Sequence, residues 1–96
     1  MLHYYMSGLL SDEEIETALP SEWEHDNDEI VRIYDFDAYL PGVEFVSTVG
    51  EIAEDAFHHP EIILRYAEVE VRLTTHDAGG ITKNDTDLAA RFDEAY

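Results

Sequence analysis

Apolar residues recur at helical spacing in the middle of the chain, between Val43 and Ala56. From Phe45 onward they fall within a stripe about 120° wide if the chain advances about 100° per residue. Acidic and hydroxyl side chains fill the opposite side of the same segment. The pattern predicts an amphipathic helix over 43–56 that buries its apolar stripe against another layer.

Two further helices are predicted from the residues at which they start. Residues 11–14 read Ser-Asp-Glu-Glu, a capping box in which the serine and the last glutamate satisfy free backbone N–H groups. This predicts a short helix over 12–19 that ends before Pro20. Thr82 and Asp85 open a last helix with the same spacing. The apolar side of that helix consists of Leu88, Phe92 and Tyr96.

Two stretches between the helices have the composition and alternation that are typical of strands. Residues 29–36 are rich in β-branched and aromatic side chains and follow a polar turn at 26–28, which predicts a hairpin. Residues 62–75 alternate toward their end, and this alternation assigns His76 to the polar side. Because 62–75 is long for one strand, we expect a tight turn near Ala67-Glu68. A loop is predicted at 78–80.

The predicted element order is α-β-β-α-β-β-α. Strands joined by short turns form an antiparallel sheet, and three amphipathic helices need one face of that sheet to bury their apolar sides. We therefore predict a two-layer α+β fold, with a four-stranded antiparallel sheet and three helices packed on one face. The other face is open to a site or a partner. One domain is expected over 9–96, with residues 1–8 as an N-terminal extension.

The charge balance narrows the classes of partner. The 96 residues carry 23 acidic and 5 basic side chains, so the net charge is −18. Such a surface repels nucleic acid and anionic membranes, and neither is expected as a partner. Hydrophobic residues make up 45% of the chain, which is enough to form a hydrophobic core. The charge therefore indicates a folded protein from a salt-rich cytoplasm, where ions screen dense carboxylates.

Two absences in the sequence bear on location and chemistry. No apolar run approaches the roughly 20 residues that span a membrane, and the N-terminus does not resemble a secretory signal, so we expect a cytoplasmic protein. There is no cysteine, which excludes disulfides and thiolate metal ligands.

Three histidines in the second half of the chain are the candidates for chemistry. Imidazole has an ordinary pKa of about 6.5 and exchanges protons near neutral pH. Pro60 favours an extended backbone at His59, so His58 and His59 diverge and can approach a flat ligand from different directions. His76 is the third. Two other interpretations stay open, namely surface histidines at a helix end and a zinc site, although adjacent histidines rarely chelate one ion well.

Glu54 lies one helical turn before His58 and could hold the tautomer of a histidine. The residues alone lead to a histidine-containing α+β domain whose role is undecided.

The spacing of these residues resembles a known signature. Glu54-x-x-x-His58-His59-Pro60 is followed at fixed distances by further matching positions, and Trp23 stands after the first helix. The sequence is similar to the pterin-4a-carbinolamine dehydratases over roughly residues 9–94. The further matching positions are Tyr66, Thr75-His76-Asp77, Gly79-Gly80-Ile81-Thr82 and Asp85.

The resemblance implies a fold that agrees with the predicted one, assembly as a homodimer or homotetramer, and a small-molecule pterin substrate. It implies dehydration of 4a-hydroxytetrahydropterin to quinonoid dihydropterin without a cofactor or a metal. The implied catalytic residues are His58, His59 and His76, with acid–base work by His58 and His76 and ring binding chiefly by His59. The implied substrate-binding residues are Glu54, Pro60, Tyr66, Thr75, Asp77 and Asp85.

Two other roles are compatible with the resemblance. Members of the family also act without catalysis, as dimerisation modules and coactivators of other proteins, and a pterin-related role in molybdopterin metabolism is a further alternative. Two positions depart from the family pattern. Phe57 stands where many members carry Asn or Asp, and Ile62 stands where many carry Trp. Both positions would affect how the pterin ring is held.

Overall fold

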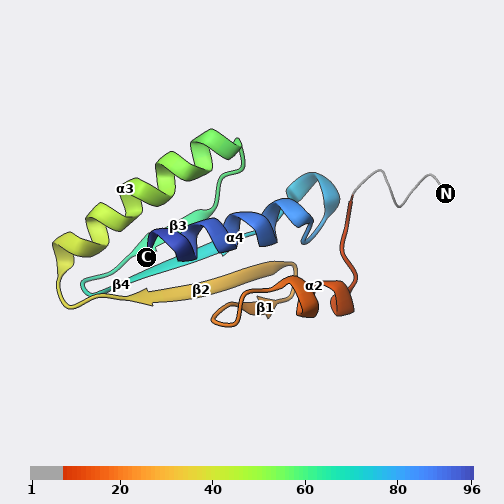
Figure 1. Cartoon of the computed structure of the whole chain (residues 1–96), viewed down its shortest axis with the longest axis horizontal. Helices are drawn as coiled ribbons and strands as arrows, with labels where there is room; N and C mark the ends of the chain where they lie inside the picture. Colours follow the sequence, from red (N-terminus) through yellow and green to blue (C-terminus); the bar gives the residue numbers. More distant parts are fainter. Residues whose placement is uncertain (1–7) are drawn as a thin grey trace.

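The computed structural model describes residues 8–96, whose helices and strands follow the predicted order (Figure 1). Of the predicted extension over 1–8, only Gly8 lies within the described residues. The helices are α2 (Asp12–Ala18), α3 (Tyr39–Ala56), the short 3₁₀ helix η1 (His76–Ala78) and α4 (Lys83–Ala95). The strands are β1 (Glu24–Asp26), β2 (Glu29–Asp35), β3 (Glu61–Leu64) and β4 (Glu68–Leu73).

The four strands form one antiparallel sheet in the order β1-β2-β4-β3. Alternate residues of β2 and β4 point to the same side, where α3 and α4 cover the sheet (Figure 1). Ile15 of α2 joins the same hydrophobic core. The predicted α+β class, with three helices and a four-stranded antiparallel sheet, is confirmed. The buried apolar residues of the two central strands are Ile30, Tyr34, Val69, Val71 and Leu73.

The predicted starts of the first and last helices are confirmed. At α2, the Glu14 N–H donates to the Ser11 hydroxyl at 3.1 Å, and the Ser11 N–H donates to the Glu14 carboxylate at 2.8 Å. At α4, the Thr82 N–H donates to the Asp85 carboxylate at 2.9 Å. These capping bonds are local, so they can be predicted from spacing alone.

Two element boundaries differ from the prediction. The long helix begins at Tyr39, about one turn before the predicted start at Val43. The prediction missed this turn because its residues are mostly exposed and carry little of the apolar periodicity. Strand β4 ends at Leu73, so His76 belongs to η1 and the prediction that it lies on the polar face of the strand is wrong. The chain bends there because the Thr75 N–H donates to the Gly80 carbonyl at 2.9 Å, which closes a tight loop.

The turn between β3 and β4 is close to the predicted position. It spans residues 65–67, and the Arg65 N–H donates to the Glu68 carbonyl at 2.9 Å. The hairpin forms without glycine or proline. It sets Glu61 opposite Arg72, which brings the two ends of the hairpin together.

A single carboxylate joins α4 to the first strands. Asp93 Oδ1 accepts hydrogen bonds from Trp23 Nε1 at 3.0 Å, Arg32 Nη1 at 2.9 Å and Tyr34 Oη at 2.6 Å. The guanidinium of Arg32 also lies over the Tyr34 ring, 4.3 Å from its centroid. Burial, together with the negative charge and hydrogen bond of Asp93, raises the pKa of Tyr34 far above its usual range. Asp93 therefore holds three partners that meet only in the folded chain.

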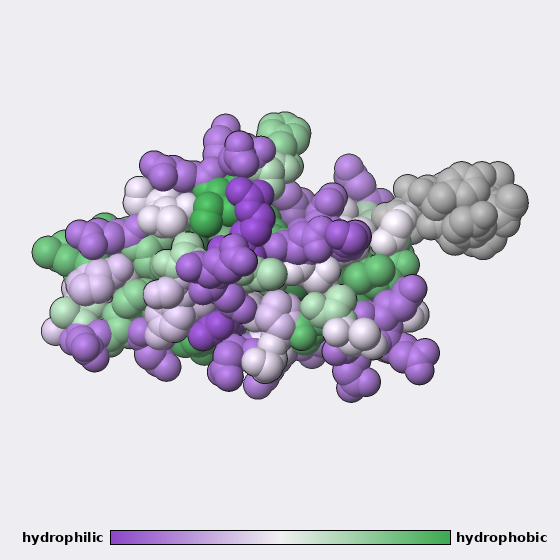
Figure 2. Space-filling view, in the orientation of Figure 1, coloured by the Kyte–Doolittle hydropathy of each residue, from purple (hydrophilic) through white to green (hydrophobic). Residues whose placement is uncertain are grey.

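Hydrophilic residues cover much of the face seen in Figure 2. All five basic side chains lie within ion-pair distance of a carboxylate. The 23 acidic side chains outnumber them, so the surface keeps a large excess of negative charge. Within residues 8–96, no helix is long and apolar enough to cross a membrane.

On the sheet face opposite the helices, Glu70 lies between two arginines. Its carboxylate accepts from Arg65 Nη2 at 2.7 Å and from Arg72 Nε at 2.6 Å, and the residue is only 6% exposed. The hydrogen bond from Arg65 is the largest cause of a lowered pKa of Glu70, and Arg72 adds to it against the effect of burial. Glu70 is therefore buried on this face as part of an ion-pair cluster.

We expect Glu70→Gln to lower the free energy of unfolding at pH 7. A carboxyl whose folded-state pKa is depressed contributes stability above its unfolded pKa of about 4.3, and loses it as pH falls through the folded value. The difference between the variant and the parent should therefore shrink below about pH 4. Urea unfolding at fixed molar salt from pH 7 to pH 3 measures it. Glu61→Gln on the same sheet face is the control, and a Glu70→Gln deficit that is constant with pH would contradict the charge effect.

Candidate active site

A hollow of about 300 Å³ brings the three candidate histidines together. One wall comes from the end of α3 and carries His58 and His59, and the other follows β4 and carries His76. The two walls meet because the β3–β4 hairpin returns the chain to the end of α3. The full lining consists of Phe57, His58, His59, Thr74, Thr75, His76 and Asp77.

The end of α3 sets the direction of the two adjacent histidines. The His58 N–H donates to the Ala53 carbonyl at 3.1 Å and the Phe57 N–H donates to the Glu54 carbonyl at 3.1 Å, the two bonds of a Schellman motif. The motif requires a left-handed residue, and Phe57 has φ 53° and ψ 44°. The reversal of the chain at Phe57 turns His58 away from the axis of α3 and toward α4.

This helix ending changes the partner of Glu54. Because α3 stops at Ala56, Glu54 and His58 do not share a helix face, and that part of the prediction is wrong. Glu54 Oε1 lies 2.8 Å from His59 Nε2, and both side chains are more than half exposed. Glu54 therefore holds a histidine, but it is His59.

His58 is anchored on a fully buried carboxylate. Its Nε2 atom lies 2.6 Å from Asp85 Oδ1, and the Asp85 side chain is 0% exposed. The other oxygen, Oδ2, accepts from the Thr75 hydroxyl at 2.7 Å and from the Thr82 N–H at 2.9 Å. The hydroxyls of Thr75 and Thr82 are themselves 2.9 Å apart. Both oxygens of Asp85 are thus occupied by fixed partners.

The anchor determines which atom of His58 can act on a ligand. An ionised carboxylate only accepts hydrogen bonds, so the proton of the neutral imidazole is on Nε2. Nδ1 is then the lone-pair nitrogen, and no described residue donates to it or accepts from it. The arrangement matches a base with an orienting carboxylate behind it, in which the carboxylate stabilises the imidazolium after proton uptake.

The other two histidines are more accessible than His58. The His59 side chain is 54% exposed, whereas that of His58 is 17% exposed. His76 is exposed in η1, where the Gly79 N–H donates to the His76 carbonyl at 3.0 Å and holds the loop closed. The hollow therefore combines one oriented histidine with two that a ligand can reach from its open side.

The other predicted site residues fall into three groups. Thr75 and Asp77 line the hollow, and Asp85 lies behind His58 as its anchor. Pro60 is half-buried at the start of β3 and Glu54 holds His59. Tyr66 lies in the β3–β4 turn, at the opposite end of the hairpin from the histidines, so one chain does not bring it to the hollow.

Two residues of the site were not among the predicted site residues: Thr82 and Phe57. Thr82 was predicted as a helix start and matches the family signature without a role in the site, but its N–H and hydroxyl also complete the cradle of Asp85. The Thr82–Asp85 capping box was the available signal. Phe57 lines the hollow, whereas Ile62 packs against the hydrophobic core. Of the two departures, only Phe57 bears on the site.

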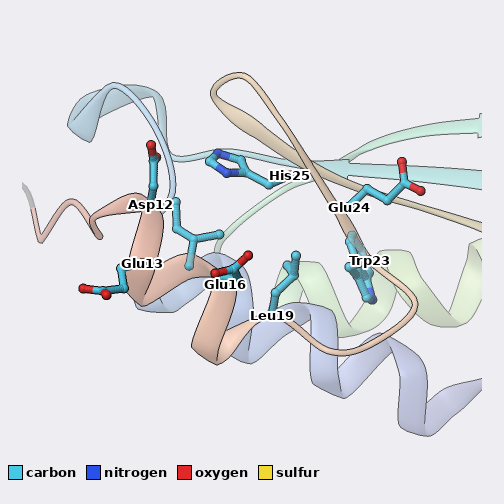
Figure 3. Close-up of a pocket in the computed structure, with 8 residues that line it drawn as sticks. Asp12, Glu13, Glu16, Leu19, Trp23, Glu24 and His25 are labelled. Carbon is cyan, nitrogen blue, oxygen red and sulfur yellow. The ribbon is translucent and has the colours of Figure 1, made fainter.

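A larger hollow, about 720 Å³, lies between α2 and β1 (Figure 3). Figure 3 shows that α2 contributes several of its acidic side chains; Trp23 is the residue before β1, and Glu24 and His25 come from β1 itself. His25 is the one histidine in its lining. The smaller hollow brings three histidines together, so we assign the chemistry to it.

The chain is similar to known proteins of one family over most of its length. A family model described as pterin 4 alpha carbinolamine dehydratase matches residues 8–95. A haloarchaeal relative from Natronomonas pharaonis, whose name places it among the pterin-4-alpha-carbinolamine dehydratases, is 61% identical over 93% of this chain and 97% of its own length. A relative of the same name from Haloarcula marismortui is 60% identical over 91% of this chain and 95% of its own length.

A solved structure shows the same fold. The crystal structure of a transcriptional coactivator/pterin dehydratase from Brucella melitensis matches with a TM-score of 0.83 and 28% sequence identity. The match covers 88% of this chain and 95% of the Brucella chain. Among residues 8–96, no group of three or more His, Cys, Asp or Glu side chains is arranged to hold a metal ion.

Proposed function

Because the chain belongs to the pterin-4a-carbinolamine dehydratase family, we propose that its histidine hollow carries out the dehydration for which the family is named. The activity is that of a hydro-lyase, and the substrate class is a pterin carbinolamine. The observation that carries the proposal is that His58, anchored on the buried Asp85, lines the same hollow as His59 and His76.

The reaction needs two proton transfers and no other reagent. In 4a-hydroxytetrahydropterin, the bond from C4a to the hydroxyl oxygen breaks as that oxygen receives a proton, and water leaves. The proton on N5 is removed, and its electron pair forms the double bond between N5 and C4a of the quinonoid product. Each positioned transfer typically contributes about 10²- to 10⁴-fold to the rate.

The contacts favour a division of roles between the histidines. His58 takes the N5 proton on Nδ1, because Asp85 stabilises the imidazolium that results. His76, on the opposite wall, delivers the proton to the leaving hydroxyl. His59, held by Glu54, binds the ring. Exchange with water through the open side then restores both histidines.

We expect His76→Ala to lower kcat for the dehydration by about 10²-fold, because one of two positioned proton transfers is lost. The measurement follows the dehydration of synthetic 4a-hydroxytetrahydropterin in molar KCl, with the parent, His76→Ala and His25→Ala. His25 is exposed on β1 and should be dispensable. A well-folded parent without activity would favour a non-catalytic binding module, and equal losses in both variants would contradict the role of His76.

The oligomer predicted from the resemblance is also proposed here. Large apolar side chains are exposed outside the hollow, including Leu40 at 67% and Ile33 at 46%, and a short chain gains stability from burying such groups against a second copy. A homodimer or homotetramer is therefore expected in light scattering at molar salt. The net charge of −18 supports a salt-rich cytoplasm and disfavours nucleic acid and anionic membranes as partners.

A further inference from the structure

We propose that Phe57 is a substrate-contacting residue whose ring stacks on the flat bicyclic ring of the pterin. The proposal rests on the proposed function, since it concerns the same hollow. It assigns a ligand-binding role to a residue that is neither a proton donor nor a proton acceptor.

The backbone of Phe57 is in a conformation that its side chain disfavours. Its φ of 53° and ψ of 44° are left-handed, a region that suits glycine and asparagine. The Schellman motif at this position needs only the backbone. A bulky aromatic residue with positive φ is a true outlier, and such outliers cluster at functional sites. The helix ending therefore explains the left-handed backbone but not the phenyl ring.

Packing within the chain does not explain the ring either. Phe57 is 82% exposed, the largest value among the exposed large hydrophobic residues of the described part of the chain. The aromatic contact that residues 8–96 give it is with His59, at a centroid distance of 5.8 Å and an interplanar angle of 79°. Such an edge-on contact restrains the ring but leaves most of its surface in water. The ring is thus held in place without being buried.

The location of the ring indicates what covers it. Phe57 lines the hollow together with the three histidines, on the wall that carries His58 and His59. The edges of a pterin ring carry its polar atoms, which the histidines can reach, and its faces are apolar. Aromatic rings attract flat heterocycles face to face or edge to face. Phe57 therefore supplies an apolar contact in a lining that is otherwise mostly polar.

The test exploits opposite effects on stability and binding. Asn fits the left-handed conformation better than Phe, so Phe57→Asn should raise Tm by about 2–6 °C. The same change should weaken binding of a stable 7,8-dihydropterin by about 5- to 20-fold, as expected for the loss of one stacking contact. Phe57→Tyr keeps the ring and should bind like the parent. Leu40→Asn, which removes another exposed apolar side chain of α3, should leave binding unchanged.

Equilibrium binding by fluorescence quenching in molar KCl is the measurement, with Tm, kcat and KM recorded for the same four proteins. Raised Tm, weaker binding and a higher KM in Phe57→Asn alone would support the proposal. Unchanged dihydropterin affinity in Phe57→Asn would overturn the proposal. If the oligomer mass also changed in that variant, the exposed ring would belong to a contact between copies instead. Binding does not require turnover. A parent protein that binds dihydropterin but does not dehydrate the carbinolamine would therefore refute the proposed function, while the binding comparison would still test the role of Phe57.

Discussion

His58→Ala is expected to lower kcat for the dehydration by about 10³-fold with the fold intact. The variant removes the one histidine that is oriented by a buried carboxylate, and a positioned base typically contributes about 10²- to 10⁴-fold. Asp85→Asn should lose about 10²-fold, although the imidazole stays. An asparagine that turns its oxygen toward Thr75 and Thr82 presents its NH₂ group to His58 Nε2, which moves the histidine proton to Nδ1.

The losses in kcat caused by His58→Ala and Asp85→Asn should not multiply in the double variant. Because both variants disable the same base, the double variant should be about as slow as His58→Ala alone. Nitrogen chemical shifts of His58 provide a readout that a merely structural role would not move, since the protonated nitrogen should change from Nε2 to Nδ1 in Asp85→Asn. Asp87→Asn, an exposed change on the same helix, is the control. If the losses in kcat multiplied in the double variant, or if the His58 proton stayed on Nε2 in Asp85→Asn, Asp85 would not act through His58.

Asp93→Ala is expected to have the largest effect on stability, about 3–5 kcal/mol. It leaves the charge of Arg32 without its partner at a site where the side chain is 15% exposed. It also removes the hydrogen-bond acceptor of Trp23 Nε1 and Tyr34 Oη. Few domains of this size have more than about 10 kcal/mol of stability, so a substantial fraction of the variant would unfold at low salt.

Urea unfolding in molar KCl measures the difference, with Glu94→Ala on the same helix as the control. Asp93→Asn keeps one acceptor and should lose less, so it gives a value even where Asp93→Ala does not fold. A loss below about 1 kcal/mol in Asp93→Ala, similar to that of an exposed ion pair, would show that the three donors find other acceptors.

The sequence predicted those elements whose signals are local. Capping boxes act over three residues, so the starts at Ser11 and Thr82 could be identified without knowing the fold. The apolar period of 45–56 identified the long helix, and the polar turn at 26–28 identified the first hairpin. The apolar periodicity did not predict the first turn of α3, because that turn is mostly exposed. It also failed at His76, where a loop rather than the strand places the side chain.

Residue types and spacing, read against a family signature, also named the three histidines and Asp85. They placed Glu54 on the same helix face as His58, which is wrong, because the i, i+4 rule assumes that the helix continues to His58, and the left-handed Phe57 ends it first. The resemblance includes Tyr66 among the substrate-binding residues, and within one chain the hairpin places it in the β3–β4 turn, away from the histidines.

By itself, therefore, the sequence determined the order of the elements, the α+β class and the residues available for acid–base chemistry, since these depend on periodicity and on side-chain type. Only the tertiary structure decided that Asp85 holds His58, that Asp93 joins Trp23, Arg32 and Tyr34, and that Glu70 is buried between arginines. Each of these contacts depends on the direction in which the side chains point. The contacts of Asp85 and Asp93 join separate elements, and those of Glu70 join residues of the sheet and its turn. For His58 and Asp85 the direction depends on how the chain turns at Phe57 and after Leu73, and no spacing rule encodes those two turns.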